Sequence, residues 1–237
     1  MRTVAVVLAG GSGTRFGSAG PKQLQLLAGR SLIEHCVRAF DQAPAVDDVL
    51  VVATPDIGEQ VRPSLVGYGK LADIIDGGVT RTDSSRQALG WLRTRMSGDT
   101  KVLIHDAARP LIDQQTIAAC AAALDSFDAV GIVVSSSDTI VEVADGIMQR
   151  VLPRETLVRC QTPQGFRLSV ISAAYQLPDA DTSFAEIPAT DDCGVVLRYL
   201  PDVPVAVVAG SERNIKVTYA ADLTVAAALL DSAESQS

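Results

Sequence analysis

The sequence predicts an α/β protein whose central sheet is mostly parallel. Short apolar segments of strand length alternate with helical segments from the N-terminus onward, and such alternation is typical of a parallel sheet with right-handed crossovers. Aromatic residues make up only 4% of the chain, so Val, Ala, Leu and Ile must supply the core, as they do in strands buried on both faces. We therefore expect a Rossmann-like three-layer sandwich with helices on both sides of the sheet.

The individual elements follow from local patterns. The expected strands are the apolar runs 4–9, 48–53, 72–75, 102–104, 129–134 and 203–209, with a short segment at 215–218. The expected helices are 31–40, 56–66, 84–96, 113–124, 168–175 and 220–230. Ser31 with Glu34, and Ser84 with Gln87, have the spacing of capping boxes. No repeat or low-complexity linker divides the chain, so we expect a single domain, 1–237.

One segment departs from this alternation. Residues 138–143 and 147–151 flank a turn at Ala144-Asp145-Gly146, which predicts a β-hairpin. Its residues are only half apolar, so the hairpin should project from the main sheet. An exposed hairpin has unpaired edges, which pairing with a second copy would remove. We therefore expect a β-arm over 138–160 that joins a homodimer.

Composition excludes several classes of protein. Lys and Arg number 20 against 28 Asp and Glu, for a formal net charge of −8, which argues against a general nucleic-acid binder but not against a small phosphorylated substrate. The apolar runs are far shorter than the ~20 residues of a membrane span, and the N-terminus does not read as a signal peptide. The four cysteines form no C-x-x-C pair, which predicts no zinc site and reduced thiols in a cytoplasmic protein.

A glycine-rich loop follows the first predicted strand. It reads L-A-G-G-S-G-T-R-F-G from Leu8 to Gly17. Clustered glycines let the backbone approach a ligand and turn its N–H groups towards phosphate oxygens. The dinucleotide fingerprint G-x-G-x-x-G fails because Phe16 stands at its last glycine, and the ATPase loop fails because Lys22 lies between Pro21 and Gln23. A nicotinamide dehydrogenase is therefore disfavoured.

Two cations distinguish this loop. Arg15 lies inside it and Lys22 closes it. A forked guanidinium and a compact ammonium beside a glycine cradle suit a triphosphate. The alternative is a tight turn that carries two solvent-exposed basic residues.

The motifs along the chain resemble those of nucleotidyltransferases that activate sugar or alditol phosphates. The loop motif G-G-S-G-T-R-F-G is followed by P-K-Q, and the order then continues with G-G-V-T-R-T-D-S (77–84), H-D-A-A-R-P (105–110), D-T-I (138–140), P-R-E-T-L (153–157), Q-T-P-Q-G-F (161–166), T-D-D (190–192) and N-I-K-V-T (214–218). Over nearly the whole chain this set is similar to the 2-C-methyl-D-erythritol 4-phosphate cytidylyltransferase family.

The resemblance implies a single nucleotidyltransferase domain that joins CTP and an alditol phosphate and releases pyrophosphate. Such a reaction needs positioning and charge neutralisation rather than a covalent nucleophile. The implied catalytic residues are Arg15, Lys22, Arg154 and Lys216. The implied nucleotide-binding residues are Ala9, Gly10, Gly11, Gly13, Gly78, Arg81, Asp83, Ser84 and Ala107. The implied acceptor-binding residues are Asp106, Arg109, Thr139 and Thr162, and Asp106 is also the implied magnesium ligand.

Several of these residues have a structural alternative. Asp83 and Ser84 could simply cap a helix, and Asp106 could structure the turn that follows its strand. Arg154 could be a surface arginine, although the resemblance places it and Thr139 in the partner's active site. We expect His105 to be structural rather than a base, because phosphate oxygens need no deprotonation near neutral pH. Asp191 and Asp192 are given no role beyond a pair at a helix N-terminus.

Two departures from the family pattern bear on the identity of the acceptor. The family usually has P-A-A-G-x-G where this chain has L-A-G-G-S-G, and often has tryptophan where Val158 stands. The loop version found here is common in relatives that use other acceptors, including ribitol 5-phosphate cytidylyltransferases. A pentitol phosphate such as D-ribitol 5-phosphate is therefore the alternative acceptor. A non-catalytic nucleotide-binding protein is a further alternative, which the retention of the charged residues disfavours.

Overall fold

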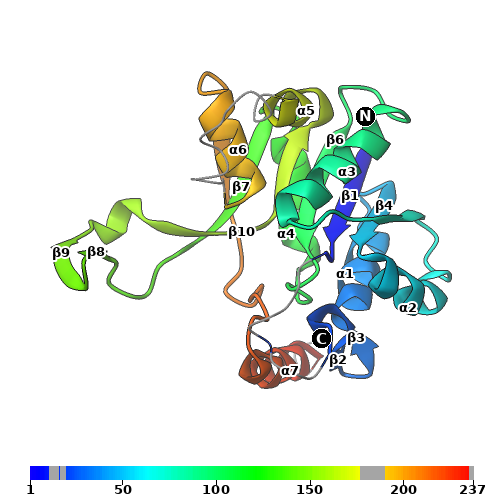
Figure 1. Ribbon diagram of the computed structural model, residues 1–237, viewed down its shortest axis with the longest axis horizontal. Coiled ribbons are helices and arrows are strands. Elements are labelled where there is room, and N and C mark those ends of the chain that lie inside the picture. Colours follow the sequence, from blue (N-terminus) through cyan, green and yellow to red (C-terminus); the bar gives the residue numbers. More distant parts are fainter. Residues whose placement is uncertain (11–15, 17–19, 177–189, 235–237) are drawn as a thin grey trace.

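The protein is described here from a computed structural model, over residues 1–10, 16, 20–176 and 190–234. A central sheet runs through the molecule with helices on either side, and one hairpin stands away from the body (Figure 1). Within the described ranges, no helix combines the length and the apolar character needed to cross a membrane.

The central sheet has seven strands in the order β11-β7-β10-β6-β1-β4-β5. These are β11 (Val205–Ala209), β7 (Ala129–Ser135), β10 (Val158–Arg167), β6 (Lys101–Asp106), β1 (Thr3–Leu8), β4 (Asp48–Ala53) and β5 (Leu71–Asp76). All pairings are parallel except those of β10, which runs antiparallel to both β6 and β7. The predicted class, a mostly parallel α/β sheet, is confirmed.

Helices cover the two faces of the sheet and bury a separate apolar cluster on each. One face packs against α1 (Leu32–Asp41), α2 (Pro55–Leu65) and α4 (Gln114–Ala123). The other face packs against α3 (Arg81–Arg93), α5 (Leu168–Gln176) and α6 (Asp192–Tyr199). Side chains alternate along β1, so Ala5 and Val7 join the first cluster while Val4 and Val6 join the second. The three predicted layers are therefore present.

A smaller cluster lies at one end of the body. The C-terminal helix α7 (Ala220–Glu234) packs there with the short strands β2 (Leu26–Leu27) and β3 (Arg30–Ser31). Val217, fully buried, joins this cluster from the short segment expected at 215–218, which has no regular secondary structure.

The hairpin that stands apart consists of β8 (Val141–Ala144) and β9 (Ile147–Val151), as predicted (Figure 1). Its turn places Asp145 and Gly146 at positive φ, the conformation that a two-residue hairpin turn requires. The predicted limit at 160 is too late, because Val158 already pairs with Ser135 of the main sheet. The arm therefore ends at the short 3-10 turn Arg154–Thr156.

Three features differ from the prediction: strand β10, the start of α3 and helix α6. The sequence of β10 contains Q-T-P-Q-G, and proline and glycine argue against a central strand. The sheet accommodates them with a shift in register between Gln161 and Gly165. Helix α3 also begins three residues before the predicted start, because Thr80 and Asp83 form the capping box and Ser84 lies inside the helix. Helix α6 was not among the predicted helices, although Asp191 and Asp192 were interpreted as a pair at a helix N-terminus.

Candidate active site

The carboxyl end of β6 opens into a polar pocket of about 250 Å³. In an open α/β sheet, ligands bind outside the carboxyl ends of the strands, because the loops that follow the strands converge there. The pocket is lined by Arg81, Asp106, Arg109, Cys160, Gln161, Thr162, Gln164, Thr190, Asp191 and Lys216. Arg81, Asp106, Arg109, Thr162 and Lys216, predicted from separate motifs, thus come together here.

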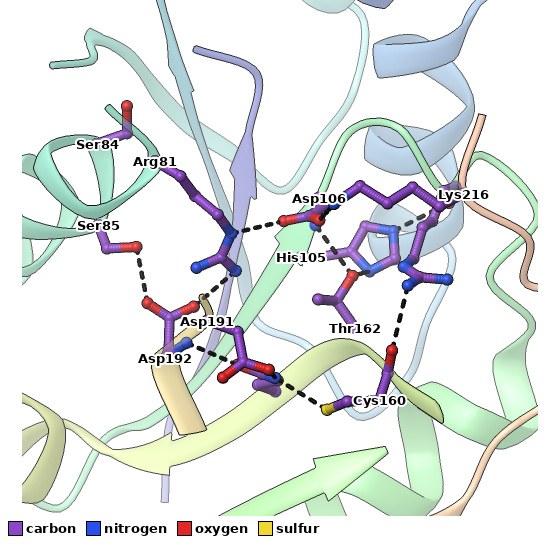
Figure 2. Close-up of polar contacts among 12 residues, drawn as sticks. Arg81, Ser84, Ser85, His105, Asp106, Cys160, Thr162, Asp191, Asp192 and Lys216 are labelled. Atoms are coloured by element: carbon purple, nitrogen blue, oxygen red, sulfur yellow. Dashed lines mark hydrogen bonds and ion pairs between the residues drawn. The ribbon is translucent and has the colours of Figure 1, made fainter. Parts of the chain in front are cut away.

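The electrostatic centre of this pocket is Asp106. Its Oδ1 lies 3.0 Å from Nε of Arg81, and its Oδ2 lies 2.7 Å from Nζ of Lys216 (Figure 2). Burial alone would raise the pKa of this carboxyl, but Arg81 and Lys216 together hold it well below its usual range. Asp106 is therefore ionised, and both of its oxygens are occupied by cations.

His105 organises the loop beneath the pocket. Its Nε2 lies 3.0 Å from the carbonyl oxygen of Arg109, which can only accept, so Nε2 carries the proton. Burial lowers the pKa of His105 to about 4, so the ring is neutral and Nδ1 accepts from the Thr162 hydroxyl at 3.1 Å. The same hydroxyl accepts from the backbone N–H of Asp106. His105 thus has the structural role that was expected, and the hydroxyl proton of Thr162 is used in the hydrogen bond to Nδ1 of His105.

Folding stability should fall by about 2 kcal/mol between pH 7 and pH 5 because of His105 alone, whose pKa drops from the model-peptide value 6.5 to about 4 on folding. The unfolded chain takes up a proton as the pH falls through 6.5, whereas the folded chain does not until about pH 4, so acid favours unfolding. Urea titrations at the two pH values measure the difference. His105→Gln should flatten this slope, and an unchanged slope in that variant would contradict the assignment.

Arg109 is held by backbone carbonyls rather than by a carboxylate. Its Nη1 donates to the carbonyl of Asn214 at 2.8 Å, and its Nη2 to that of Cys160 at 3.4 Å. Asn214 is fully buried and donates in turn to the carbonyl of Thr162 at 2.9 Å. The guanidinium is therefore placed at the pocket wall while its positive charge remains available to an anion.

Two glycines, Gly10 and Gly78, lie close against the start of α3. A Cβ on Gly10 would lie 2.7 Å from Oγ of Ser84, and one on Gly78 would lie 2.1 Å from Cβ of Asp83. Ser84 itself donates to the carbonyl of Thr80 and accepts from the N–H of Gly78. Asp83 belongs to the capping box of α3, which is the structural role given above as its alternative. These glycines are thus required by close packing, whatever ligand the loop holds.

Some predicted nucleotide contacts have little surface to offer. Ala107 is fully buried in the core and Ala9 is 1% exposed. The N–H of Ala107 donates to Leu8, and the N–H of Ala9 donates to Val52. The side chains of these alanines therefore serve packing in this structure. Gly11, Gly13 and Arg15 lie outside the described residues.

Lys22 opens a 3-10 turn, Lys22–Leu24, that is attached to the end of β1. The attachment is Gln23, whose buried Nε2 donates to the carbonyl of Ala9 at 2.8 Å. Lys22 therefore lies beside the strand end from which the glycine loop departs. The predictions on Thr139 and Arg154 concern the arm instead: both residues are exposed, and Arg154 donates to the carbonyl of Ser137 at 3.0 Å.

The sequence reasoning gave no pocket role to a second set of polar residues: Gln164 and Asp191, which line the pocket, and Asp192, which lies behind it. Asp191 caps α6 by accepting from Gly194 at 2.8 Å, as its reading as a helix N-terminal residue predicted. Asp192 does more, because its Oδ2 lies 2.7 Å from Nη2 of Arg81. Gln164 connects both residues to β10: its amide donates to Asp191 and accepts from the N–H of Asp192. The Q-T-P-Q-G and T-D-D motifs marked these residues, but no local pattern indicated that they meet.

The protein alone does not form a magnesium site in the part of the chain described. No cluster of three or more His, Cys, Asp or Glu side chains there could hold a metal ion. Magnesium in nucleotide sites is bound by one or two carboxylates together with substrate phosphates. Asp106 is of the right type, but an ion at its oxygens would have to displace Lys216 or Arg81. Among the described residues, Asp106 could therefore contribute at most one carboxylate to a magnesium ion, and substrate phosphates would supply further ligands.

Comparison with known sequences agrees with the motif order. The family model described as 2-C-methyl-D-erythritol 4-phosphate cytidylyltransferase matches residues 3–232. A protein of that name from Thermobifida fusca is 49% identical over 97% of this chain and 93% of its own length. A Haemophilus influenzae protein named bifunctional ribulose 5-phosphate reductase/CDP-ribitol pyrophosphorylase Bcs1 is 34% identical, over 98% of this chain but 48% of its own length.

Solved structures give the same result. A 4-diphosphocytidyl-2C-methyl-D-erythritol synthase from Anaerococcus prevotii superposes with a TM-score of 0.83 at 27% identity, covering 97% of this chain and 98% of its own. A 2-C-methyl-D-erythritol 4-phosphate cytidylyltransferase from Thermus thermophilus superposes with a TM-score of 0.74 at 28% identity, covering 98% of this chain and 100% of its own. In sequence and in fold, the chain belongs to the 2-C-methyl-D-erythritol 4-phosphate cytidylyltransferase family.

Proposed function

We propose that this protein transfers a cytidylyl group from CTP to 2-C-methyl-D-erythritol 4-phosphate. A relative of that name is 49% identical over nearly the full chain, which supports both the chemistry and the acceptor. The observation that carries the proposal is the cluster of Arg81, Asp106 and Lys216 at the carboxyl end of β6. Two anionic reactants need such a site, where cations are held ready by a carboxylate.

In the proposed reaction, an oxygen of the acceptor phosphate attacks the α-phosphorus of CTP. A new P–O bond forms, the bond to the β-phosphate oxygen breaks, and pyrophosphate leaves with that electron pair. No proton transfer is required, because the attacking phosphate is already ionised near neutral pH. The chain has only to bring the reactants into line and neutralise charge on the oxygens of the transferred and leaving groups.

The pocket at β6 suits the smaller reactant. Its volume of about 250 Å³ is below the ~300–1,000 Å³ typical of sites that enclose drug-sized ligands. We therefore assign the acceptor to this pocket, with Lys216 and Arg109 on its phosphate and Asp106 accepting from its hydroxyls; Thr162 supplies part of the wall. The triphosphate would lie over the glycine loop, Arg15 and Lys22, with the cytosine and ribose against Gly78, Asp83 and Ser84.

Lys216 is the cation best placed to exchange partners. Its side chain is 43% exposed, whereas that of Arg81 is 25% exposed. When an acceptor phosphate enters, the ammonium can turn from Asp106 towards it, and Arg81 still neutralises Asp106. The exchange costs little because one ion pair replaces another.

A homodimer joined by the β-arm is part of this proposal. The arm exposes Val143, Ile147, Met148 and Val151, each more than half exposed, on a two-stranded hairpin with open edges. A second copy would bury these side chains. Thr139 and Arg154 would then reach the partner's acceptor, with Arg154 clamping the attacking phosphate.

The proposal also includes a magnesium ion and a cytoplasmic location. Magnesium carried by the triphosphate would supply additional neutralisation, and Asp106 is the nearby carboxylate. A cytoplasmic location fits the free thiols of Cys36, Cys120, Cys160 and Cys193, which a reducing compartment preserves.

Pyrophosphate release from CTP, measured with each acceptor in turn, tests the proposed function. We expect turnover with 2-C-methyl-D-erythritol 4-phosphate at a kcat/KM at least about tenfold above that with D-ribitol 5-phosphate, since a missing or misplaced hydroxyl leaves buried polar groups unpaired. EDTA should abolish turnover and excess magnesium should restore it. A preference for ribitol 5-phosphate would reassign the acceptor, and CTP binding with neither acceptor used would support a non-catalytic protein.

A further inference from the structure

Asp192 holds a pocket residue although it does not line the pocket itself. It begins α6, and its side chain is 0% exposed. Its Oδ2 lies 2.7 Å from Nη2 of Arg81, whose Nε lies 3.0 Å from Oδ1 of Asp106 (Figure 2). The guanidinium is therefore fixed between two carboxylates, one at the pocket and one behind it.

The carboxylate of Asp192 is itself held from several elements. Oγ of Ser85 on α3 and Oη of Tyr175 on α5 both donate to its Oδ1, at 2.8 and 2.6 Å. The backbone N–H groups of Asp192 and Cys193 donate to Oε1 of Gln164 on β10, at 3.0 and 3.1 Å. The carboxylate of Asp192 is thus held from α3 and α5, and its backbone is held from β10.

This arrangement gives Arg81 and Lys216 different roles. Arg81 is tied to a fixed buried charge, so it stays with Asp106 when a ligand arrives. Among the described residues, Lys216 pairs with one carboxylate, that of Asp106, and it is the more exposed of the two cations. Without the buried carboxylate, Arg81 would be free to turn into the pocket and pair with a substrate phosphate, while Lys216 would be needed to neutralise Asp106.

We propose that Asp192 is a positioning residue for the transfer reaction: it pins Arg81 against Asp106 and so leaves Lys216 available to the acceptor phosphate. The inference rests on the proposed function and extends it to a residue that touches no substrate. The competing reading is that Asp192 only stabilises the junction of α3, α5 and α6. The two readings differ in whether Asp192 acts through Arg81.

A double-mutant cycle in kcat/KM separates the two readings. Arg81→Gln and Asp192→Asn should each lower kcat/KM by at least about tenfold, and the double variant should lie within about threefold of the worse single variant, because both remove the same ion pair. Independent roles would instead multiply, giving a loss of about a hundredfold or more in the double variant. That multiplication, or wild-type kinetics in Arg81→Gln, would overturn the proposal.

Tyr175→Phe is the matched control. It removes a donor from the same buried carboxylate but leaves the charge and the Arg81 pair in place, so its thermal midpoint should fall while kcat/KM stays within about twofold of wild type. An equal loss of turnover in Tyr175→Phe would favour the purely structural reading. If Asp192→Asn alone does not fold, comparing Arg81→Gln with the double variant still decides, because the double leaves no unpaired buried charge. Wild-type turnover tests the proposed function separately.

Discussion

Replacing Lys22 with alanine is expected to lower kcat by about a hundredfold, equivalent to ~3 kcal/mol of transition-state stabilisation, and to leave the fold intact. Negative charge builds up on the leaving pyrophosphate as its bond to the α-phosphorus breaks. The turn that carries Lys22 is fixed to the end of β1 by Gln23, so Lys22 begins its turn near the strand end that leads into the loop assigned to the triphosphate. Pyrophosphate release under saturating CTP and acceptor measures the effect.

Lys70→Ala provides the matched control for Lys22. Lys70 precedes β5, at the amino end of the sheet and so at the opposite edge from the site, where its Nζ donates to the carbonyl of Ala43 at 2.7 Å. The same chemical change is made there without touching the proposed site, so kcat should stay near the wild-type value. Equal kcat in Lys22→Ala and wild type, with both chains folded by thermal melting, would contradict the role given to Lys22.

Mixing two inactive variants should restore activity if the arm completes the partner's site. Arg154→Ala and Lys22→Ala chains would each form defective homodimers. A mixed dimer would contain one site with Lys22 from one chain and Arg154 from the other, so random exchange should recover about a quarter of the wild-type activity per chain. The expected change is from near zero to a quarter, which pyrophosphate release resolves easily.

The control for this experiment is subunit exchange itself. Chains with tags of different mass show whether mixed dimers form, and Arg154→Ala mixed with a second preparation of Arg154→Ala should remain inactive. Mixed dimers without recovered turnover would mean that Arg154 serves its own chain. A chain that stays monomeric at all concentrations would remove the arm from the site altogether.

Much of the fold was predictable because central strands such as β1 and β4 are continuous apolar runs. β4 spans Asp48–Ala53 as expected, since its side chains face helices on both sides and apolar periodicity is unmistakable there. β10 was not predictable, because most of its buried positions before Phe166 are polar or small and its pairing depends on two distant strands, β6 and β7. A hydrophobic pattern identifies a strand by the apolar side chains that it buries, whereas much of β10 lines a polar pocket.

The sequence identified several residues of the site, but it did not show which of them contact one another. Arg81, Asp106 and Lys216 were each marked by a motif, but their ion pairs join α3, β6 and a loop near the C-terminus. Asp192 was visible only as a helix N-terminal residue, because its partner Arg81 is more than a hundred residues away in the chain. Three-dimensional proximity of this kind has no signature in one sequence.

The position of β10 constrains where the gene can gain or lose codons. The strand leaves the arm at Val158 and reaches the pocket at Thr162 and Gln164. A one-codon deletion between these points would shift the register of the strand, so Thr162 and Gln164 would lose their partners Asp106 and Asp191. Length variation should therefore accumulate in the hairpin turn at Asp145 and Gly146, where backbone can be added without shifting the strand.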